Sequence, residues 1–415
     1  MFGFFVIVLV SLVGCGPDES STNPSESEES EKPEKLTIWE DIGKAKALEP
    51  AIESFEEEHG ISVEVKEVEM SSEMKERIRL DGPAGTGPDV FTLPHDQIGQ
   101  LATEGILQPL KFEDSVLNTF TKSSLASQTF KGEIYGLPKA TETAVFIYNK
   151  DLMKEVPATS EELFQLSKEK RSDESYGFLA VWSNLYFGYS VIGGMGGYIF
   201  EETNGTLDPT QLGLNNEGAV EGAAYIRKWY EEGLFPKGLY GENGGSTMDS
   251  LFTEGKAAAV MAGPWAFQSY EDAGVNIGVA PLPKLPNENP MKTFIGVKGW
   301  HVSSFSKHTD WSQKLVEHLT NYENAKVRFK TTGEIPPVKE LLEDPIIKDN
   351  EKANAVSVQS QSGVPMPNIP EMAEVWGPMG TALELITLGK SEPEEALDEA
   401  VDSIKSNIKA NHSQD

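Results

Sequence analysis

Residues 36–94 alternate between short apolar runs and longer amphipathic runs, and this order constrains the fold more than any other feature of the chain. Strand-like runs lie at 36–40, 61–68 and 88–93, and helical runs lie between them at 48–59 and 71–80. A β-α-β-α-β order predicts a parallel sheet covered by helices. Ligands of such sheets gather beyond the carboxyl ends of the strands, so we expect a binding site at that edge.

A second α/β region is expected further along the chain. Residues 144–148 form another strand-like run, and helices are expected around 160–170 and 217–232. The 380 residues after position 35 are enough for two domains of ordinary size, each with its own core. The sequence therefore predicts an α/β protein with two lobes.

The N-terminal segment has the features of a signal peptide followed by an anchor. Residues 4–13 form an apolar run that is shorter than the ~20 residues needed to span a bilayer. Cys15, the one cysteine of the chain, has no partner for a disulfide or a thiolate metal site. The sequence Leu-Val-Gly-Cys at 12–15 resembles the bacterial lipobox, which implies a signal peptide at 1–14 and a diacylglyceryl group on Cys15. A buried structural cysteine is the alternative.

The segment after Cys15 is expected to be a disordered tether. Residues 17–35 contain no aromatic or large aliphatic side chain, so they cannot bury enough apolar surface to offset the entropy of ordering. Their excess of carboxylates favours an extended chain. We therefore predict that residues 15–35 hold the folded part away from a membrane surface.

The net charge of −31 disfavours nucleic acids and other partners that are bound through phosphates. The sequence contains no HExxH pair and no GxxxxGK[ST] loop, and the glycine-rich residues 82–90 lead into a strand, so they are not a nucleotide-binding turn. We expect no metal, no cofactor and no catalytic residue.

Several sequence blocks resemble the periplasmic maltose/maltodextrin-binding proteins, the solute receptors of carbohydrate ABC importers. These blocks are WEDIGK, GTGPDVFTLPHDQIG, GEIYGLPKATETAVFIYNKDL, FTEGKAAAVMAGPWAF and VPMPNIPEMAEVW. The resemblance covers about residues 36–408. It implies the two-lobed type II periplasmic-binding-protein fold, in which each lobe has a mainly parallel sheet flanked by helices and the ligand cleft lies between the lobes.

The same resemblance implies lobe boundaries and partners. The N-terminal lobe would comprise 36–141 and 299–330, and the C-terminal lobe 144–294 and 336–409. The lobes would close around the ligand at crossings near Thr141–Thr143, Ile295–Lys298 and Thr332–Pro336. The partners implied are a maltose or maltodextrin ligand and the permease subunits of an importer. The chain would be a monomer, held by its lipid on the outer face of the cytoplasmic membrane in a bacterium without an outer membrane.

The candidate site residues suit the chemistry of a sugar, which presents hydroxyls at its rim and apolar C–H groups on its faces. By resemblance, Lys44, Asp96 and Glu142 fall on hydroxyl-binding positions, and Tyr186, Trp265 and Trp376 fall on stacking positions. Glu73 lies near the acidic pair at a helix start of the family, and Gln97 and Asn184 complete the expected ligand-binding residues. Each charged residue has the alternative of an ordinary solvated charge, and each aromatic residue that of a core side chain. Trp229 and Trp311 lie in amphipathic helical patterns and are predicted to be structural.

Four positions depart from the family pattern. Asn184 replaces a glutamate, Leu93 a tryptophan, and Gln97 and Gly380 replace arginines. These changes could shift affinity or preferred chain length. A receptor for a different oligosaccharide is one alternative, and a lipid-anchored glycoside hydrolase, with two of the carboxylates as acid and nucleophile, is another.

Overall fold

The alternation predicted for residues 36–94 is confirmed by the structure, a computed structural model that describes residues 32–172, 174–203, 206–241 and 243–412. The elements are β1 (Lys35–Glu40), α1 (Glu49–His59), β2 (Ser62–Glu67), α2 (Met74–Asp81) and β3 (Val90–Pro94). Helix α1 ends at Gly60, whose φ of 61° lies in the left-handed region that glycine adopts without strain. The predicted signal peptide, Cys15 and residues 16–31 of the tether lie outside the described residues.

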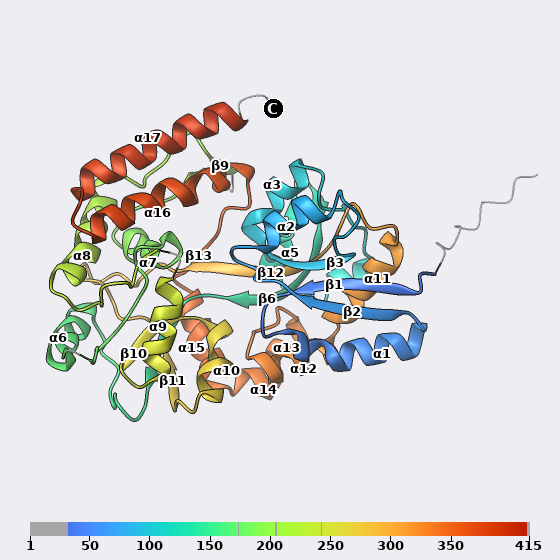
Figure 1. Cartoon of the computed structure of the whole chain (residues 1–415), viewed down its shortest axis with the longest axis horizontal. Helices are drawn as coiled ribbons and strands as arrows, with labels where there is room; N and C mark the ends of the chain where they lie inside the picture. Colours follow the sequence, from blue (N-terminus) through green and yellow to red (C-terminus); the bar gives the residue numbers. More distant parts are fainter. Residues whose placement is uncertain (1–31, 173, 204–205, 242, 413–415) are drawn as a thin grey trace, which may run out of the picture. The chain divides into compact units, whose positions relative to one another are not determined.

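The larger sheet has six strands, most of which belong to the first lobe (Figure 1). Besides β1, β2 and β3 it contains β6 (Gly136–Glu142), β12 (Phe294–Val302) and β13 (Val364–Pro365). Strand β1 lies between β2 and β3 and is parallel to both. Strand β12 is antiparallel to both β3 and β6, so the sheet is mixed.

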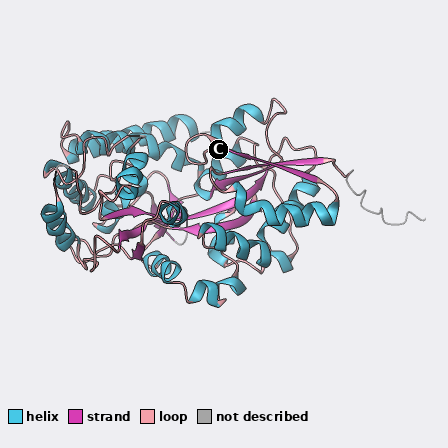
Figure 2. Ribbon diagram, turned by 60° about the horizontal axis from the view of Figure 1, so that its bottom comes forward, coloured by secondary structure: helices cyan, strands magenta, loops and turns pink. Residues whose placement is uncertain are grey.

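Helices cover both faces of this sheet (Figures 1 and 2). Successive residues of β1 point to opposite faces: Ile38 belongs to the same core cluster as Phe55 of α1, and Trp39 to the cluster of Met74 and Ile78 of α2. Helices α11 (Thr309–Thr320) and α12 (Tyr322–Thr332) contact α1 and lie on its side of the sheet. Helices α3 (Ile98–Thr103) and α5 (Lys122–Ser127) lie on the α2 side. The β1 side chains are thus buried on both faces, as is usual for a parallel sheet.

The second lobe contains a smaller sheet, of order β10-β7-β11. Its strands are β7 (Val145–Asn149), β10 (Ala259–Ala262) and β11 (Ile277–Ala280). The expectation of a mainly parallel sheet is wrong here, because β7 is antiparallel to both neighbours. Strands β10 and β11 are connected through α10 (Pro264–Asp272) in a β-α-β unit, and β7, which continues directly from β6, is inserted between them in the opposite direction.

The remaining elements of the second lobe surround this sheet. Its longer helices are α6 (Ser160–Lys170), α7 (Leu185–Gly194), α8 (Glu217–Glu231), α9 (Gly244–Thr253), α15 (Glu351–Ser360), α16 (Ala373–Thr387) and α17 (Pro393–His412). Trp229 is fully buried and contacts Phe164, Trp182 and Phe235 through their rings, so its predicted core role is confirmed. Trp311 is half-buried on α11.

Buried hydrogen bonds hold the segments that connect the two sheets. The Thr143 hydroxyl lies 2.6 Å from the Thr293 hydroxyl and donates to the Phe294 carbonyl at 2.8 Å. The backbone N–H of Thr141 donates to the carbonyl of Ile335 at 2.7 Å. These bonds fix β6 against the start of β12 and against the segment that follows α12. Among the described residues, no helix is both long and apolar enough to cross a membrane.

Candidate functional site

Three strands of the larger sheet end at one edge and present polar side chains there. Strands β3 and β6 run in the same direction because both are antiparallel to β12, and β1 is parallel to β3. Asp41 and Lys44 follow β1, Asp96 lies in the short helix after β3, and Glu142 is the last residue of β6. The structure therefore brings predicted site residues together where parallel strands place their ligands.

Three predicted stacking residues lie in the first turns of three helices of the second lobe. Tyr186 is the second residue of α7, Trp265 is the second residue of α10 and Trp376 is the fourth residue of α16. The Tyr186 and Trp265 ring centroids are 6.0 Å apart, and Phe294 lies 6.1 Å from Tyr186 and 5.9 Å from Trp376. The rings of Trp265, Tyr186 and Trp376 are thus connected in one row through the buried Phe294.

The charged edge and the aromatic surface meet. Lys44 Nζ donates a hydrogen bond of 3.2 Å to the backbone carbonyl of Trp265. Against the larger effect of burial, the Trp376 side chain lowers the pKa of Asp96, and the Glu142 charge adds to the effect of burial on the pKa of Tyr186. Residues from both lobes therefore line one site.

Burial controls the protonation of this site. It raises the pKa of Asp96 to about 6, with the Glu142 charge acting in the same direction. The pKa of Glu142 is also raised by burial, against the opposing effect of Lys298, and that of Tyr186 is raised well above its usual value by burial. Buried oxygens that find no protein hydrogen bond include Tyr186 Oη and Gln97 Oε1, and these are groups that a polar ligand can satisfy.

The departures from the family pattern have structural counterparts. Asn184 is the N-cap of α7, where its Oδ1 accepts a hydrogen bond from the Tyr186 N–H at 2.9 Å; asparagine serves this role better than glutamate. Leu93 is fully buried in the core cluster of Trp39, so its side chain is not available to a ligand. Gly380 lies one turn after Trp376 on α16 and faces open space.

Glu73 is the N-cap residue of α2. Its side chain is 59% exposed, and its carboxylate lies 3.9 Å from Arg77 one turn along α2. Its role in the site stays a prediction.

Two buried charged residues near Glu142 were not predicted from the sequence, namely Lys298 and Glu334. Lys298 Nζ lies 2.9 Å from Glu142 Oε2 and 2.8 Å from Glu334 Oε1, and both new side chains are nearly fully buried. The sequence contained one signal: Lys298 interrupts the apolar run Phe294–Val302, and a lysine inside a buried strand requires a partner.

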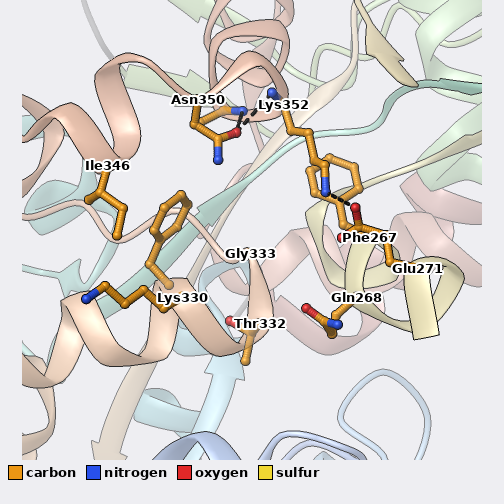
Figure 3. A pocket seen from close by; sticks show the side chains of 11 residues that line it. Phe267, Gln268, Glu271, Lys330, Thr332, Gly333, Ile346, Asn350 and Lys352 are labelled. Carbon is orange, nitrogen blue, oxygen red and sulfur yellow. Dashed lines mark hydrogen bonds and ion pairs between the residues drawn. The ribbon is translucent and has the colours of Figure 1, made fainter. Parts of the chain in front are cut away.

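A separate pocket of 210 Å³ lies between α10 and α12 (Figure 3). It is lined by Phe267, Gln268 and Glu271 of α10 and by residues of α12, including Lys330 and Thr332. Residues two positions apart on a helix point in different directions, so Trp265 and Phe267 face different surroundings. None of the residues lining this pocket is a predicted site residue. No cluster of three or more potential metal-ligating His, Cys, Asp or Glu side chains occurs in the described part of the chain.

Comparison with protein families gives a match over residues 50–355 to the bacterial extracellular solute-binding proteins. The chain belongs to this family. The resemblance to the solute receptors of carbohydrate importers is confirmed, and so is the prediction that the protein is not an enzyme, because the members of this family are receptors.

The relatives of this solute-binding protein extend over nearly its whole length. A galactooligosaccharide-binding protein of Bacillus subtilis is 46% identical over 100% of this chain and 98% of its own. The maltodextrin-binding protein MdxE of the same organism is 35% identical over 98% and 97%. A solved cyclo/maltodextrin-binding protein in complex with maltotetraose is 43% identical, with a TM-score of 0.78 and coverage of 93% of this chain and 100% of that one. The expected two-lobed type II fold is thereby confirmed.

Proposed function

We propose that this solute-binding protein captures a short hexose oligosaccharide between its lobes and delivers it to the permease subunits of an ABC importer. The observation that carries the proposal is the meeting of two groups at one site: Asp96 and Glu142 from the first lobe, and the rings of Tyr186, Trp265 and Trp376 from the second. Carboxylates accept hydrogen bonds from sugar hydroxyls, and flat rings cover the apolar C–H faces. A sugar unit needs both.

For the substrate, we place galactooligosaccharides first and maltodextrins second. Within one organism, the galactooligosaccharide receptor is 46% identical to this chain and the maltodextrin receptor 35%. The buried Leu93, the capping Asn184 and the open space at Gly380 also remove features of the maltodextrin pattern. Maltodextrins remain the second candidate because a receptor solved with maltotetraose is 43% identical.

We also propose that ligand binding closes the lobes. A ligand drives closure only if it binds the closed form more tightly, which it does by contacting both lobes at once. The proposed boundaries remain 36–141 with 299–330 for the first lobe, and 144–294 with 336–409 for the second. Small-angle scattering of the full chain tests this: the radius of gyration should fall on saturation with sugar, and an unchanged value contradicts closure.

The proposed location is the outer face of the cytoplasmic membrane, where the lipid on Cys15 anchors the chain. Two or more acyl chains are needed for stable retention, because a single chain binds a membrane only marginally. The family description supports an extracellular position. The described part of the chain would act as a monomeric receptor above the membrane.

Calorimetry on the full chain tests the sugar proposal. The panel comprises β-1,4-galactobiose and galactotriose, maltose, maltotriose, a cyclodextrin and cellotriose, with Asp96→Asn and Glu142→Gln as variants. We expect tighter binding of galactotriose than of maltotriose, and a loss of about tenfold or more in each variant, as hydrogen bonds to charged groups are worth ~1.5–3 kcal/mol. No binding of any sugar would refute the proposal. Chromatography of the sugars after a day with the protein should show no shorter product.

A further inference from the structure

Six buried charges lie where the two lobes are joined. They are three carboxylates and three cations, which balance in charge: Glu40, Glu142, Glu334, Lys139, Lys298 and Arg328. They come from the ends of β1 and β6, from the middle of β6 and β12, from α12 and from the segment after it. A buried charge is tolerated only when it is paired, so removing one partner strongly destabilises its neighbours.

Lys298 is the member of this cluster that links separate chain segments at the sugar site. Its Nζ lies 2.9 Å from Glu142 at the end of β6 and 2.8 Å from Glu334, just after α12. It lies next to an irregularity in the pairing of β12 with β6, between Lys298 and Gly299, and such bulges redirect side chains. One ammonium group therefore joins three strands or segments of the region between the lobes.

Glu142 is held on two sides in this arrangement. Its Oε2 faces Lys298, whereas its Oε1 lies over Gly296, 3.3 Å from where a β-carbon would be. Its side chain is 12% exposed and that of Lys298 only 3%, so a ligand in the cleft can touch the carboxylate but not the lysine.

We propose that Lys298 is a positioning residue of the sugar site, which fixes the Glu142 carboxylate for the ligand by bridging it to Glu334. This inference rests on the proposed function for the role of Glu142. The lysine itself does not contact the sugar. It supplies the opposite charge that lets a carboxylate stay ionised while largely removed from water.

Lys139, which lies on β6 like Glu142, provides a matched control for Lys298. Its Nζ lies 2.5 Å and 2.6 Å from the two oxygens of Glu40 and 4.5 Å from the Trp300 ring centroid. Its side chain is 1% exposed, like that of Lys298, but its partner carboxylate is not a residue of the sugar site. Breaking this pair damages a buried ion pair without removing the bridge to Glu142.

The experiment compares full-length Lys298→Met, Lys298→Arg and Lys139→Met with wild type. Binding of β-1,4-galactotriose and maltotriose is measured between pH 5.5 and 9, and urea unfolding is measured without sugar. Both methionine variants should lose stability. Lys298→Met alone should bind about tenfold or more weakly at pH 6 and recover affinity as the pH rises, because Glu142 without its cation takes up a proton more readily. Lys298→Arg should restore most of the affinity.

Other titratable groups face Glu142 as well. They are Asp41, Asp96, Tyr186 and Glu334, besides Lys298 itself. Asp96 gives even the wild type a pH dependence, so the result is the difference between variants. A pH profile of Lys298→Met equal to that of Lys139→Met would overturn the inference, since a purely structural lysine predicts that outcome.

The sugar-free arm separates this inference from the proposed function. In Lys298→Met, the Glu142 carboxylate has no cation beside it when it ionises, so its pKa in the folded protein is raised further above the unfolded value. The free energy of unfolding of this variant should therefore fall as the pH rises from 5 to 8. Adding Glu142→Gln should remove much of that fall. If the wild type binds no sugar, the proposed function fails. If adding Glu142→Gln to Lys298→Met leaves the pH dependence of the unfolding free energy unchanged, the bridge from Lys298 to Glu142 is refuted.

Discussion

Gly263→Ala should weaken sugar binding by displacing one ring. The backbone at Gly263 has φ −129° and ψ −171°, an extended conformation that alanine adopts freely. A β-carbon there would lie 2.0 Å from Cζ3, 2.3 Å from Cη2 and 2.5 Å from Cε3 of Trp265. Ordinary contact begins at 3.4 Å, so the edge of the ring must withdraw by about 1.4 Å. The substitution therefore changes the position of the Trp265 ring and leaves the main chain in place.

The size of the effect follows from this displacement. Stacking of an aromatic side chain on a nucleobase is worth ~1–3 kcal/mol, and we take this range for stacking on a sugar face. A radial gap of ~0.5–1 Å already removes a quarter to a half of each atomic contact. We expect a loss of ~0.5–1.5 kcal/mol, or roughly a two- to tenfold rise in Kd. Trp265→Ala sets the upper limit.

Calorimetry with galactotriose and maltotriose measures the loss, and thermal unfolding shows whether the fold is intact. Gly245→Ala on α9 is the control, because its β-carbon meets open space, and it should leave Kd unchanged. Two results would refute the reasoning: wild-type affinity in Gly263→Ala when Trp265→Ala binds weakly, or a loss in Gly263→Ala that exceeds the loss in Trp265→Ala.

Four further predictions concern other parts of the chain. Trp376→Ala should weaken sugar binding by ~1–3 kcal/mol with little change in Tm, whereas Trp311→Ala should lower Tm and leave Kd unchanged; calorimetry and thermal unfolding decide. Sugar affinity should fall as the pH drops below about 6, where Asp96 takes up a proton, and Asp96→Asn should flatten that profile in titrations from pH 7.5 to 5. Burial lowers the pKa of His95 to about 4 from 6.5, so the unfolded chain binds a proton at a higher pH than the folded chain does. The free energy of unfolding should therefore fall as the pH drops from 7.5 to 5, and the fall should be smaller in His95→Gln. Cys15→Ser should release the protein into the medium, as shown by blotting of cell and medium fractions; retention on the cells would contradict lipid anchoring.

Local patterns were sufficient for the first part of the fold. Strands β1, β2 and β3 and helices α1 and α2 follow from short-range periodicity, and the rule for parallel strands then placed Asp96 at the site edge. The direction of β7 could not be obtained in this way. Its pairing with β10 joins Ile147 to Val260, and no local pattern specifies a contact between residues so far apart in the sequence.

Residues of the candidate site could be predicted where the residue type alone indicates a role in sugar binding. They could not be predicted where the role depends on how side chains pack in the folded protein. Three aromatic residues at helix starts were identified, but the bridge from Lys298 to Glu334 was not, because a single lysine in a sequence reads as a solvated charge. The closeness of Gly263 to the Trp265 ring also depends on a side-chain orientation that the sequence does not encode locally.

Strand β12 sets the order in which the molecule can fold. It pairs Val302 with Val90 of β3 and Gly296 with Glu142 of β6. Strands β3 and β6 therefore cannot pair with β12 until all strands of the second sheet have been synthesised. Contacts of such sequence separation make folding slow, because loop closure must precede the gain from pairing. A truncated chain that ends before residue 294 therefore leaves β3 and β6 with exposed edges, which are open to intermolecular pairing and aggregation.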